Sequence, residues 1–402
     1  MELPLGDGTV DVTLPGRDVT VVERPGGEPV DVRAAAERAL DEPHGPALRE
    51  VVASDDDVAV VVTDVTRATP DDVLLDALFD RLPGPRERAS VILGLGLHRP
   101  MTDEEIREGL GAHADLAENH DPDAAVEVGE VDGTPVRVNP AVRDADVVLA
   151  TGMVEPHQYA GFSGGAKTVV VGAGGEPVIR YTHGPEMLSR SGVRLGRVEG
   201  NPFRDAVDRA GDVAGPDFAI NVTKGPEGVL GVAAGRPREV VRDLSTRARE
   251  ALSVEVEGTY DAVVGGVGAP KDANLYQTSR AATYLILGDH NPVGDGGRVV
   301  LPARLQEGAG EGRGERRFYE RLRSAGSAEA LYEEMRQGYE PGAQRAFVVA
   351  RALLDHDIYV THAERPDVVE ECLMHAAETV EDAVEPGSDV LVVPDALNTL
   401  VV

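Results

Sequence analysis

The chain has 402 residues, and its 71 acidic and 39 basic residues give a formal net charge of -32. This length is enough for two or three domains with sizeable buried cores. The acidic excess is scattered, without a basic face, which argues against nucleic-acid binding and favours a protein that stays soluble in high salt, where screening reduces self-repulsion. We therefore expect a halophilic source, with an ordinary acidic cytosolic protein as the alternative.

Cysteine content and hydropathy exclude further classes. Cys372 is the only cysteine, so the chain can form neither an internal disulfide nor a thiolate metal cluster. The first residues lack the charged and apolar regions of a secretory signal. No apolar run reaches the roughly 18 residues that a membrane helix needs. The sequence predicts a cytoplasmic protein without membrane or nucleic-acid partners, and it leaves the oligomeric state open.

The first ligand-binding loop is predicted near residue 64. Residues 1–30 have the alternation and the Pro-Gly-Gly punctuation of a β-hairpin region, and a helix is expected at 32–40. The valine-rich run at 58–62 predicts a buried parallel strand. Thr-Pro-Asp-Asp at 69–72 predicts a helix start, with Thr69 as the N-cap. Residues 64–67 therefore lie after a strand, where open α/β sheets bind ligands.

The same pattern of strand, loop and helix recurs twice. A strand at 90–95 precedes a loop with His98, and the capping box of Thr102 and Glu105 then opens a helix. A third strand, at 146–150, leads to a loop that carries Glu155, His157 and a glycine-rich turn. Asn-Pro at 201–202 predicts one more helix start. Three loops with reactive side chains thus meet at one edge of a sheet.

The second half of the chain shows the same alternation of elements. Strands are expected near 260–268, 296–305, 358–363 and 389–397, and helices near 281–288, 316–324, 327–337, 343–355 and 367–384. This order predicts an α/β fold of two doubly wound lobes with the active site in the cleft between them. The expected domains are an N-terminal catalytic and cofactor-tethering domain at 1–253, which residues 390–402 could complete, and a C-terminal domain at 258–388.

The predicted loops carry side chains suited to acid–base chemistry and to anion binding. His98 and His157 suit proton transfer near neutral pH, and Arg67 and Arg280 suit a carboxylate or a phosphate. Each also has a structural reading, because loop histidines are commonly solvated, Arg67 can pair with Asp64, and glycine pairs can be simple turns. A zinc site would lack a third ligand.

Lysine usage singles out one position. The chain has only three lysines, Lys167, Lys224 and Lys271, and arginine supplies the other basic residues. A primary amine can be acylated or form an imine, whereas a guanidinium is far poorer at both. Lys167 follows a Ser-Gly-Gly-Ala turn and lies between His157 and His183. This pattern indicates that something is attached to, or held by, its amine.

Several segments together resemble the nickel-pincer lactate racemase family. In chain order they are Asp64–Arg67, Gly96–Pro100, His157 with Gly161–Lys167, His183, and Pro270–Gln277. The closing segment VLVVPDALNTLV also resembles the C-terminal end of this family. The Ser-Gly-Gly-Ala-Lys block and the order of histidine, lysine and histidine are the specific parts of the resemblance.

The resemblance implies a cofactor, nickel pyridine-3,5-bisthiocarboxylic acid mononucleotide, joined covalently to the protein. The implied roles are a thioamide tether for Lys167, a nickel ligand for His183, cofactor contacts for Asp64, Val65, Thr66 and Arg67, acid–base catalysis for His98 and His157, and substrate contacts for Arg67, Tyr276, Gln277 and Arg280. It thus implies an isomerase, a racemase or epimerase that inverts carbon 2 of a 2-hydroxy acid by hydride transfer, with lactate as the leading substrate. Cofactor-synthesis enzymes are the implied partners.

One residue departs from the family pattern. Arg280 stands where lactate racemase has lysine, and arginine is longer, planar and bidentate. It still suits a carboxylate but changes the size of the pocket, so another 2-hydroxy acid or a sugar acid stays open. Two other hypotheses remain: a metallohydrolase or phospho-ligand enzyme that uses the same loops, and a non-catalytic carrier of the nickel cofactor.

Overall fold

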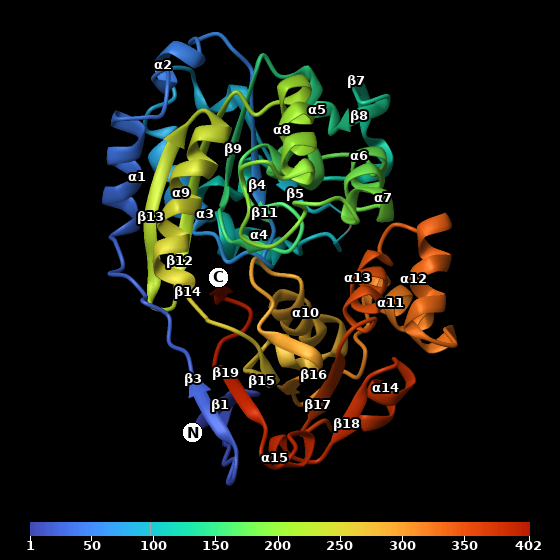
Figure 1. The fold of residues 1–402 in the computed structure, drawn as a ribbon. Helices are drawn as coiled ribbons and strands as arrows, with labels where there is room; N and C mark the ends of the chain where they lie inside the picture. Colours follow the sequence, from blue (N-terminus) through green and yellow to red (C-terminus); the bar gives the residue numbers. More distant parts are fainter. Residues whose placement is uncertain (97) are drawn as a thin grey trace. The chain divides into compact units, whose positions relative to one another are not determined.

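The structure, a computed structural model, describes residues 1–96 and 98–402. The chain forms two compact units (Figure 1). The first, here called the lysine unit, comprises Gly26–His183 and Arg190–Ala251. The second, called the terminal unit because it contains both ends of the chain, comprises Met1–Pro25, Gly184–Ser189 and Leu252–Val402. Two α/β units with parallel sheets confirm the predicted fold class.

A six-stranded sheet forms the centre of the lysine unit. Its strands are β4 (Val58–Thr63), β5 (Ala89–Gly94), β6 (Ala117–Asn119), β9 (Val147–Met153), β12 (Phe218–Gly225) and β13 (Gly228–Gly235). They lie in the order β13-β12-β9-β4-β5-β6, and all neighbours are parallel except β12 and β13. The chain runs outward from β4 to β6 and then returns to place β9 beside β4. The strand order therefore reverses between β4 and β9, which is where open sheets of this kind bind ligands.

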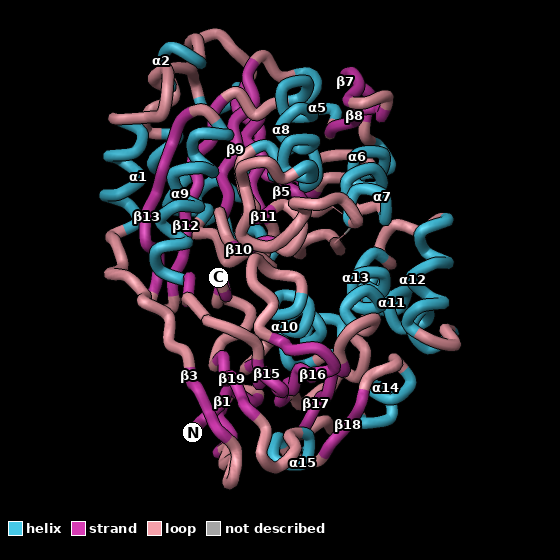
Figure 2. Tube along the Cα trace, in the orientation of Figure 1, coloured by secondary structure: helices cyan, strands magenta, loops and turns pink. Residues whose placement is uncertain are grey.

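Helices cover both faces of this sheet (Figure 2). The elements around it are α1 (Val32–Asp41), α2 (Leu48–Val51), α3 (Asp71–Phe79), η1 (Arg86–Arg88), α4 (Asp103–Leu110), η2 (Gly111–Leu116), η3 (Pro122–Ala124), α5 (Pro140–Asp144), the π-helical η4 (Thr168–Gly172), α6 (Glu176–Thr182), α8 (Pro202–Ala214) and α9 (Pro237–Leu252). Two short hairpins are β7 (Val126–Val131) with β8 (Thr134–Val138), and β10 (Pro156–His157) with β11 (Gly161–Phe162).

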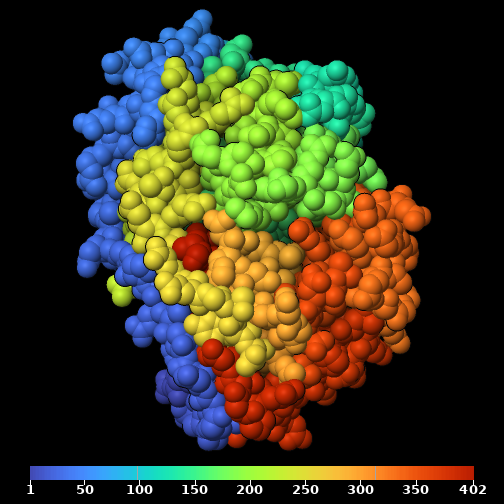
Figure 3. Space-filling model, in the orientation of Figure 1, coloured from blue at the N-terminus to red at the C-terminus, as the bar shows by residue number. Residues whose placement is uncertain are grey.

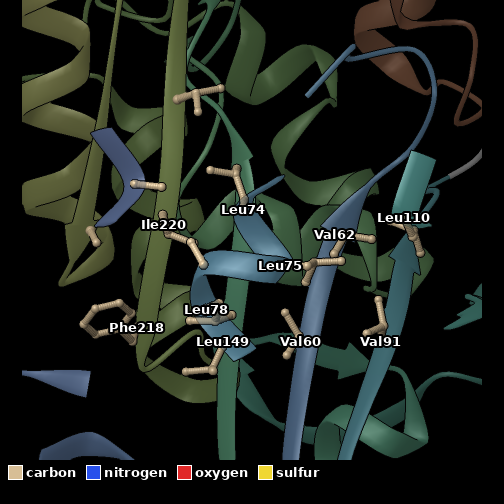
Figure 4. Packing of buried hydrophobic residues seen from close by; sticks show 14 of the residues in the cluster. Val60, Val62, Leu74, Leu75, Leu78, Val91, Leu110, Leu149, Phe218 and Ile220 are labelled. Carbon is tan, nitrogen blue, oxygen red and sulfur yellow. The ribbon is translucent and has the colours of Figure 1, made fainter. Parts of the chain in front are cut away.

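The valine-rich run forms a strand that is buried on both faces. Val60 and Val62 of β4 belong to a hydrophobic cluster with Leu74, Leu75 and Leu78 of α3, which lie over them in Figure 4. Every residue from Val58 to Val62 in β4 is buried, as expected for a central parallel strand. This packing anchors the loop that follows β4 to a rigid core.

The helices α8 and α9 form neighbouring parts of the surface drawn in Figure 3, in lime green and yellow. Arg238 of α9 pairs with Asp212 of α8 at 2.6 Å. The helix α8 begins as predicted, because the Asn201 side chain accepts hydrogen bonds from the Phe203 and Arg204 amides. The capping box predicted for α4 is also confirmed.

The terminal unit contains a second six-stranded sheet, which is entirely parallel. Its strands are β3 (Asp18–Val21), β15 (Tyr260–Gly265), β16 (Val293–Pro302), β17 (Asp357–Thr361), β18 (His375–Ala377) and β19 (Asp389–Val393), in the order β18-β17-β16-β15-β19-β3. The order reverses between β15 and β19, and the chain leaves β15 toward α10 (Leu275–Ile286). The beginning of α10 thus follows the strand at the reversal, the usual ligand edge.

The remaining elements of the terminal unit surround this sheet. They are β1 (Glu2–Leu5), β2 (Gly8–Asp11), α7 (Pro185–Leu188), β14 (Ser253–Val254), η5 (Lys271–Ala273), α11 (Arg313–Ser324), α12 (Ala328–Gln337), α13 (Gln344–Ala352), α14 (Pro366–Glu371), α15 (Val380–Ala383) and β20 (Leu400–Val401). The predicted hairpin is confirmed by the antiparallel pairing of β1 with β2. Among the described residues, no helix combines the length and the apolar character needed to cross a bilayer.

The predicted division into 1–253 and 258–388 needs correction at both ends of the chain. Residues 1–25 belong to the terminal unit, because β3 pairs with β19. Residues 390–402 belong there too, because β19 pairs with β15 and β20 with β14; they do not complete the lysine unit. The edge strand β3 and its neighbour β19 come from opposite ends of the chain, a pairing to which no local pattern points.

Two local predictions were also wrong. A helix was expected at 367–384, but β18 interrupts it: Leu373 has φ of 61°, which ends helical geometry, and His375–Ala377 joins the sheet beside β17. Thr69 does not cap α3, which begins after Pro70 without a side-chain cap. The Thr69 hydroxyl instead lies 2.8 Å from the Thr63 hydroxyl.

Candidate active site

The turn before Lys167 is held by hydrogen bonds to two strands, β9 and β12. The Ser163 hydroxyl donates to the Met153 carbonyl at the end of β9, at 2.6 Å. The Gly165 amide donates to Oδ1 of Asn221 on β12, at 2.9 Å. Gly165 has φ of +61°, and a Cβ there would lie 2.7 Å from Val241 of α9, so the turn requires glycine. The lysine therefore follows a backbone that is fixed on several sides.

Arg204 also holds this turn through hydrogen bonds. It lies on α8, only 1% of its surface is exposed, and its guanidinium donates to the carbonyl oxygens of Phe162, Ser163 and Gly164. Asp208, one helical turn later, pairs with it at 3.4 Å. Sequence reasoning gave Arg204 no role. Its spacing gave one indication of burial. Arg204 precedes the apolar Val207 by three residues, so both lie on the buried face of α8.

The amine of Lys167 is in a strongly perturbed environment. The residue keeps partial contact with solvent. Burial nevertheless lowers the pKa of the Lys167 amine from 10.5 to about 7, and the positive charges of Arg67 and Arg204 act in the same direction. A large part of the amine is thus neutral near pH 7, and only the neutral form has the lone pair that a nucleophile needs.

His183 is the C-cap residue of α6, and one of its ring nitrogens makes a hydrogen bond within the helix. Its Nδ1 lies 3.3 Å from the Ile179 carbonyl, which can only accept, and 3.0 Å from the Thr182 hydroxyl, whose own proton is donated to the Val178 carbonyl at 2.7 Å. Nδ1 of His183 therefore carries the proton. Burial, and then the charge of Lys167, lower the pKa of His183 to about 3, so the ring is neutral. The lone pair is therefore on Nε2. A neutral imidazole with its second nitrogen fixed by a hydrogen bond is the usual form of a metal-ligating histidine.

The loop after β4 binds the predicted acid–base histidine of the next loop. Oδ2 of Asp64 lies 2.5 Å from Nδ1 of His98, and Oδ1 accepts hydrogen bonds from the amide and hydroxyl of Thr66. Burial alone would raise the pKa of Asp64, but the hydrogen bonds and the charge of His98, aided by Thr66 and Arg67, hold this pKa below 3.8. Asp64 is buried, while half of the His98 side chain is exposed.

The loop after β9 contributes Glu155 and His157. Glu155 pairs with Arg67 at 2.5 Å, which links the loops after β9 and β4 at the reversal point of the sheet. His157 lies in the two-residue strand β10, and its Nδ1 accepts hydrogen bonds from the Tyr159 and Ala160 amides at 3.3 and 3.1 Å. Sequence reasoning noted Glu155 but not its pairing with Arg67.

An aromatic cluster connects the two histidines that flank the lysine in sequence. The ring of Tyr159 contacts His157 and His183, with 5.7 Å between centroids in both cases. The ring of Phe203 lies 6.1 Å from His157 and 4.9 Å from His183. The lysine unit therefore brings together most of the predicted residues: Asp64, Thr66, Arg67, His98, His157, Lys167 and His183. Val65 is 47% exposed and makes none of these contacts.

The predicted substrate residues Tyr276, Gln277 and Arg280 lie on α10 of the terminal unit, where all three are partly buried. Arg280 donates to Oε1 of Gln277 at 3.3 Å and to the Tyr284 hydroxyl at 2.9 Å. The buried Arg345 of α13 lies over the Tyr276 ring, 4.8 Å from its centroid. Their substrate role stays a prediction. Tyr284 and Arg345 were missed, although Tyr284 follows Arg280 by one helical turn.

Within the described parts of the chain, no three His, Cys, Asp or Glu residues are grouped so that they could hold a metal ion. A metal at His183 would therefore need most of its donors from a non-protein ligand. A cofactor that carries its own donor atoms fits this arrangement. A bare metal ion held by side chains alone would not.

A second buried carboxyl group lies beneath the loop after β4. Asp71 opens α3, is 5% exposed, and accepts hydrogen bonds from the hydroxyls of Thr151 and Thr63. Burial raises the pKa of Asp71 from 3.8 to about 7. The folded state therefore binds the proton more tightly than the unfolded state. This contribution to stability is complete below pH 3.8 and is lost as the pH rises through 7.

We therefore expect Asp71→Asn to become increasingly stabilising as the pH rises. Relative to wild type, its free energy of unfolding should gain about 2–4 kcal/mol between pH 4 and pH 8, because the amide needs no proton. Urea unfolding across this range measures the difference. Asp72→Asn, at the exposed next position, should show no such slope. A difference between Asp71→Asn and wild type that does not depend on pH would contradict the prediction.

Comparisons with known proteins cover nearly the whole chain. The family description "Lactate racemase N-terminal domain" matches residues 5–196, and "Lactate racemase C-terminal domain" matches residues 257–401. The lactate racemase of Lactiplantibacillus plantarum is 26% identical over 390 residues, covering 91% of this chain and 90% of that protein. The lactate racemase of Thermoanaerobacterium thermosaccharolyticum is 25% identical over 429 positions, covering 100% and 99%.

Two solved structures share the fold. The lactate racemase apoprotein from Thermoanaerobacterium thermosaccharolyticum has a TM-score of 0.89 at 22% identity and covers 100% of this chain and 99% of that chain. A Thermotoga maritima protein solved by a structural genomics consortium has a TM-score of 0.68 at 18% identity and covers 94% and 99%. At these identities the likeness concerns the fold.

Proposed function

Because the chain belongs to the lactate racemase family, a family of isomerases, we propose that it inverts carbon 2 of a 2-hydroxy acid, with lactate as the leading substrate. The observation that carries the proposal is the Lys167 amine, which follows a turn with a fixed backbone and has a pKa lowered to about 7. Solvated lysines keep values near 10.4. An amine that is largely neutral near pH 7 is suited to covalent attachment of a cofactor.

We propose the nickel-pincer nucleotide as this cofactor, joined to Lys167 and ligated through His183. The fit rests on the donors present, because His183 offers a single neutral nitrogen and no cluster of metal-binding side chains occurs among the described residues. When bound, the cofactor would supply a nickel ion and a hydride acceptor. The loop from Asp64 to Arg67 lies close enough to affect the charge of Lys167, which supports its predicted contact with the cofactor.

The protein's own residues would handle the proton and the substrate carboxylate. The hydroxyl proton of a 2-hydroxy acid must leave when its carbon 2 hydrogen departs as hydride, and a histidine near neutral pH suits this task. His98 and His157 are the proposed acid–base pair. Arg67 in the lysine unit and Tyr276, Gln277 and Arg280 in the terminal unit are the proposed carboxylate contacts, since guanidinium groups bind carboxylates strongly.

Arg280 bears on the choice of substrate. Its guanidinium donates hydrogen bonds to Gln277 and Tyr284, and it is planar and bidentate, unlike the lysine that the family pattern has here. Lactate remains the leading proposal. Another 2-hydroxy acid or a sugar acid would need the same carboxylate contact and a different surrounding pocket.

The test begins with the intact mass of protein produced in high salt together with cofactor-making enzymes. We expect an adduct of the size of a mononucleotide, located on Lys167, together with bound nickel. Lys167→Arg should lack the adduct, whereas Lys224→Arg should retain it. Absence of any adduct from wild type, under conditions where a known family member is loaded, would contradict the proposed tether.

The second stage incubates the loaded protein with single enantiomers of lactate and of other 2-hydroxy acids and sugar acids. Chiral chromatography should detect the opposite configuration at carbon 2. A loaded protein that inverts none of these acids would refute the racemase proposal and would leave the carrier hypothesis.

A further inference from the structure

The two acid–base histidines differ in the ring nitrogen that the protein contacts. At His98, Nδ1 lies 2.5 Å from the carboxylate of Asp64. The pKa of Asp64 is held below 3.8, so the carboxylate is ionised near pH 7 and can only accept a hydrogen bond. Nδ1 of His98 is therefore the donor. In the neutral ring the lone pair is then on Nε2.

At His157 the arrangement is the reverse. Its Nδ1 is approached by the backbone amides of Tyr159 and Ala160, at 3.3 and 3.1 Å. A backbone N–H can only donate, so Nδ1 must be the acceptor and cannot carry a proton without losing both contacts. The neutral ring then carries its proton on Nε2. The pairing of β10 with β11 fixes the turn that presents these two amides.

We propose that the protein presets its two acid–base histidines in opposite tautomers, with Asp64 as the positioning residue for His98 and the Tyr159 and Ala160 amides as the positioning groups for His157. The inference deepens the proposed racemase function and rests on it for its catalytic meaning. In the neutral state His98 is a base at Nε2, and His157 is a hydrogen-bond donor at Nε2.

The catalytic consequence is a built-in asymmetry between the two enantiomers. For a substrate whose hydroxyl group faces His98, the hydroxyl proton would pass to Nε2 of His98. The cofactor proposed above would, when bound, supply the acceptor for the carbon 2 hydrogen and its electron pair. For the opposite enantiomer, His157 must first move its proton from Nε2 to Nδ1, which removes two hydrogen bonds. The two histidines are thus not equivalent in the resting protein.

The test is the tautomeric state itself, measured on the cofactor-free protein. Long-range proton–nitrogen correlation spectra of protein with ¹⁵N-labelled histidine distinguish the protonated ring nitrogen. His98→Gln and His157→Gln assign the two signals among the ten histidines. We expect Nδ1–H for His98 and Nε2–H for His157 at a pH where both rings are neutral. One shared tautomer for both residues would overturn the proposal.

Variants test the positioning groups. Asp64→Asn removes the carboxylate, so His98 should lose its preference for Nδ1–H while the His157 signals stay unchanged. The matched control is Asp76→Asn, because Asp76 contacts Nε2 of His113 at 2.9 Å; this variant should affect His113 alone. An unchanged His98 tautomer in Asp64→Asn would contradict the role of Asp64. The experiment uses neither cofactor nor substrate, so its result is independent of whether racemisation is found.

Discussion

Replacing Lys167 by methionine should raise the free energy of unfolding of the cofactor-free protein by about 2–4 kcal/mol at pH 7. The reason is that the folded protein holds an amine whose pKa is lowered from 10.5 to about 7. This difference corresponds to at most about 5 kcal/mol, and the partial contact of Lys167 with solvent reduces it. Methionine is similar in length and has no charge to desolvate.

The stability advantage of Lys167→Met should decrease as the pH rises. Between pH 7 and pH 10.5 the unfolded chain binds more protons at Lys167 than the folded protein does, so wild type gains stability as the pH rises through this window. The advantage of Lys167→Met should therefore be complete below pH 7 and should shrink toward pH 10. Urea unfolding at pH 7 and pH 10 measures it. Lys224→Met removes only one exposed hydrogen bond, to the Ala68 carbonyl, and should lower stability by at most about 1 kcal/mol. A Lys167→Met variant with a lower free energy of unfolding than wild type would show that burial of the amine does not destabilise the fold.

The same substitution should abolish cofactor attachment. A stabilising change that removes function is the expected behaviour of a residue retained for its chemistry rather than for packing. The two measurements together separate a catalytic lysine from a structural one, because a structural lysine would lose stability on replacement.

Replacing His98 or His157 by alanine should lower kcat/KM for inversion of the substrate by about 10²- to 10⁴-fold, the usual contribution of a general acid or base. Neither residue is the proposed tether, so the adduct on Lys167 should persist in both variants. Chiral chromatography of initial rates and intact mass are the two measurements. His375→Ala, which replaces an exposed histidine of the terminal unit, serves as the control and should keep wild-type activity.

The double variant sharpens this prediction. If the two histidines act on the same reaction, the double variant that carries both His98→Ala and His157→Ala should lose less kcat/KM than the product of the two single fold-losses. The reason is that residues that work as a unit are non-additive. Full activity in either single variant with the adduct present would contradict the proposed acid–base pair.

Much of the lysine unit could be predicted because its signals are local. The buried run at Val58–Val62, the capping box at Thr102 and the Asn201 cap each follow from a few neighbouring residues, and all are confirmed. Parallel strands then require that the loops after β4, β5 and β9 meet at one edge. The prediction failed where distant segments decide the structure, as at β18, which is a strand because it pairs with β17.

The candidate active site also has features that the sequence determines and features that only the tertiary structure determines. The sequence by itself determined the chemistry available: a rare amine at Lys167, histidines after buried strands, and a single cysteine, which cannot form a thiolate metal cluster. Only the tertiary structure decided the state of those groups. The pKa of Lys167 depends on burial and on the charges of Arg67 and Arg204. The tautomers of His98 and His157 depend on a carboxylate from another loop and on the two amides of a turn. The sequence specifies which side chains are present, but their protonation depends on groups that only folding brings within a few ångströms.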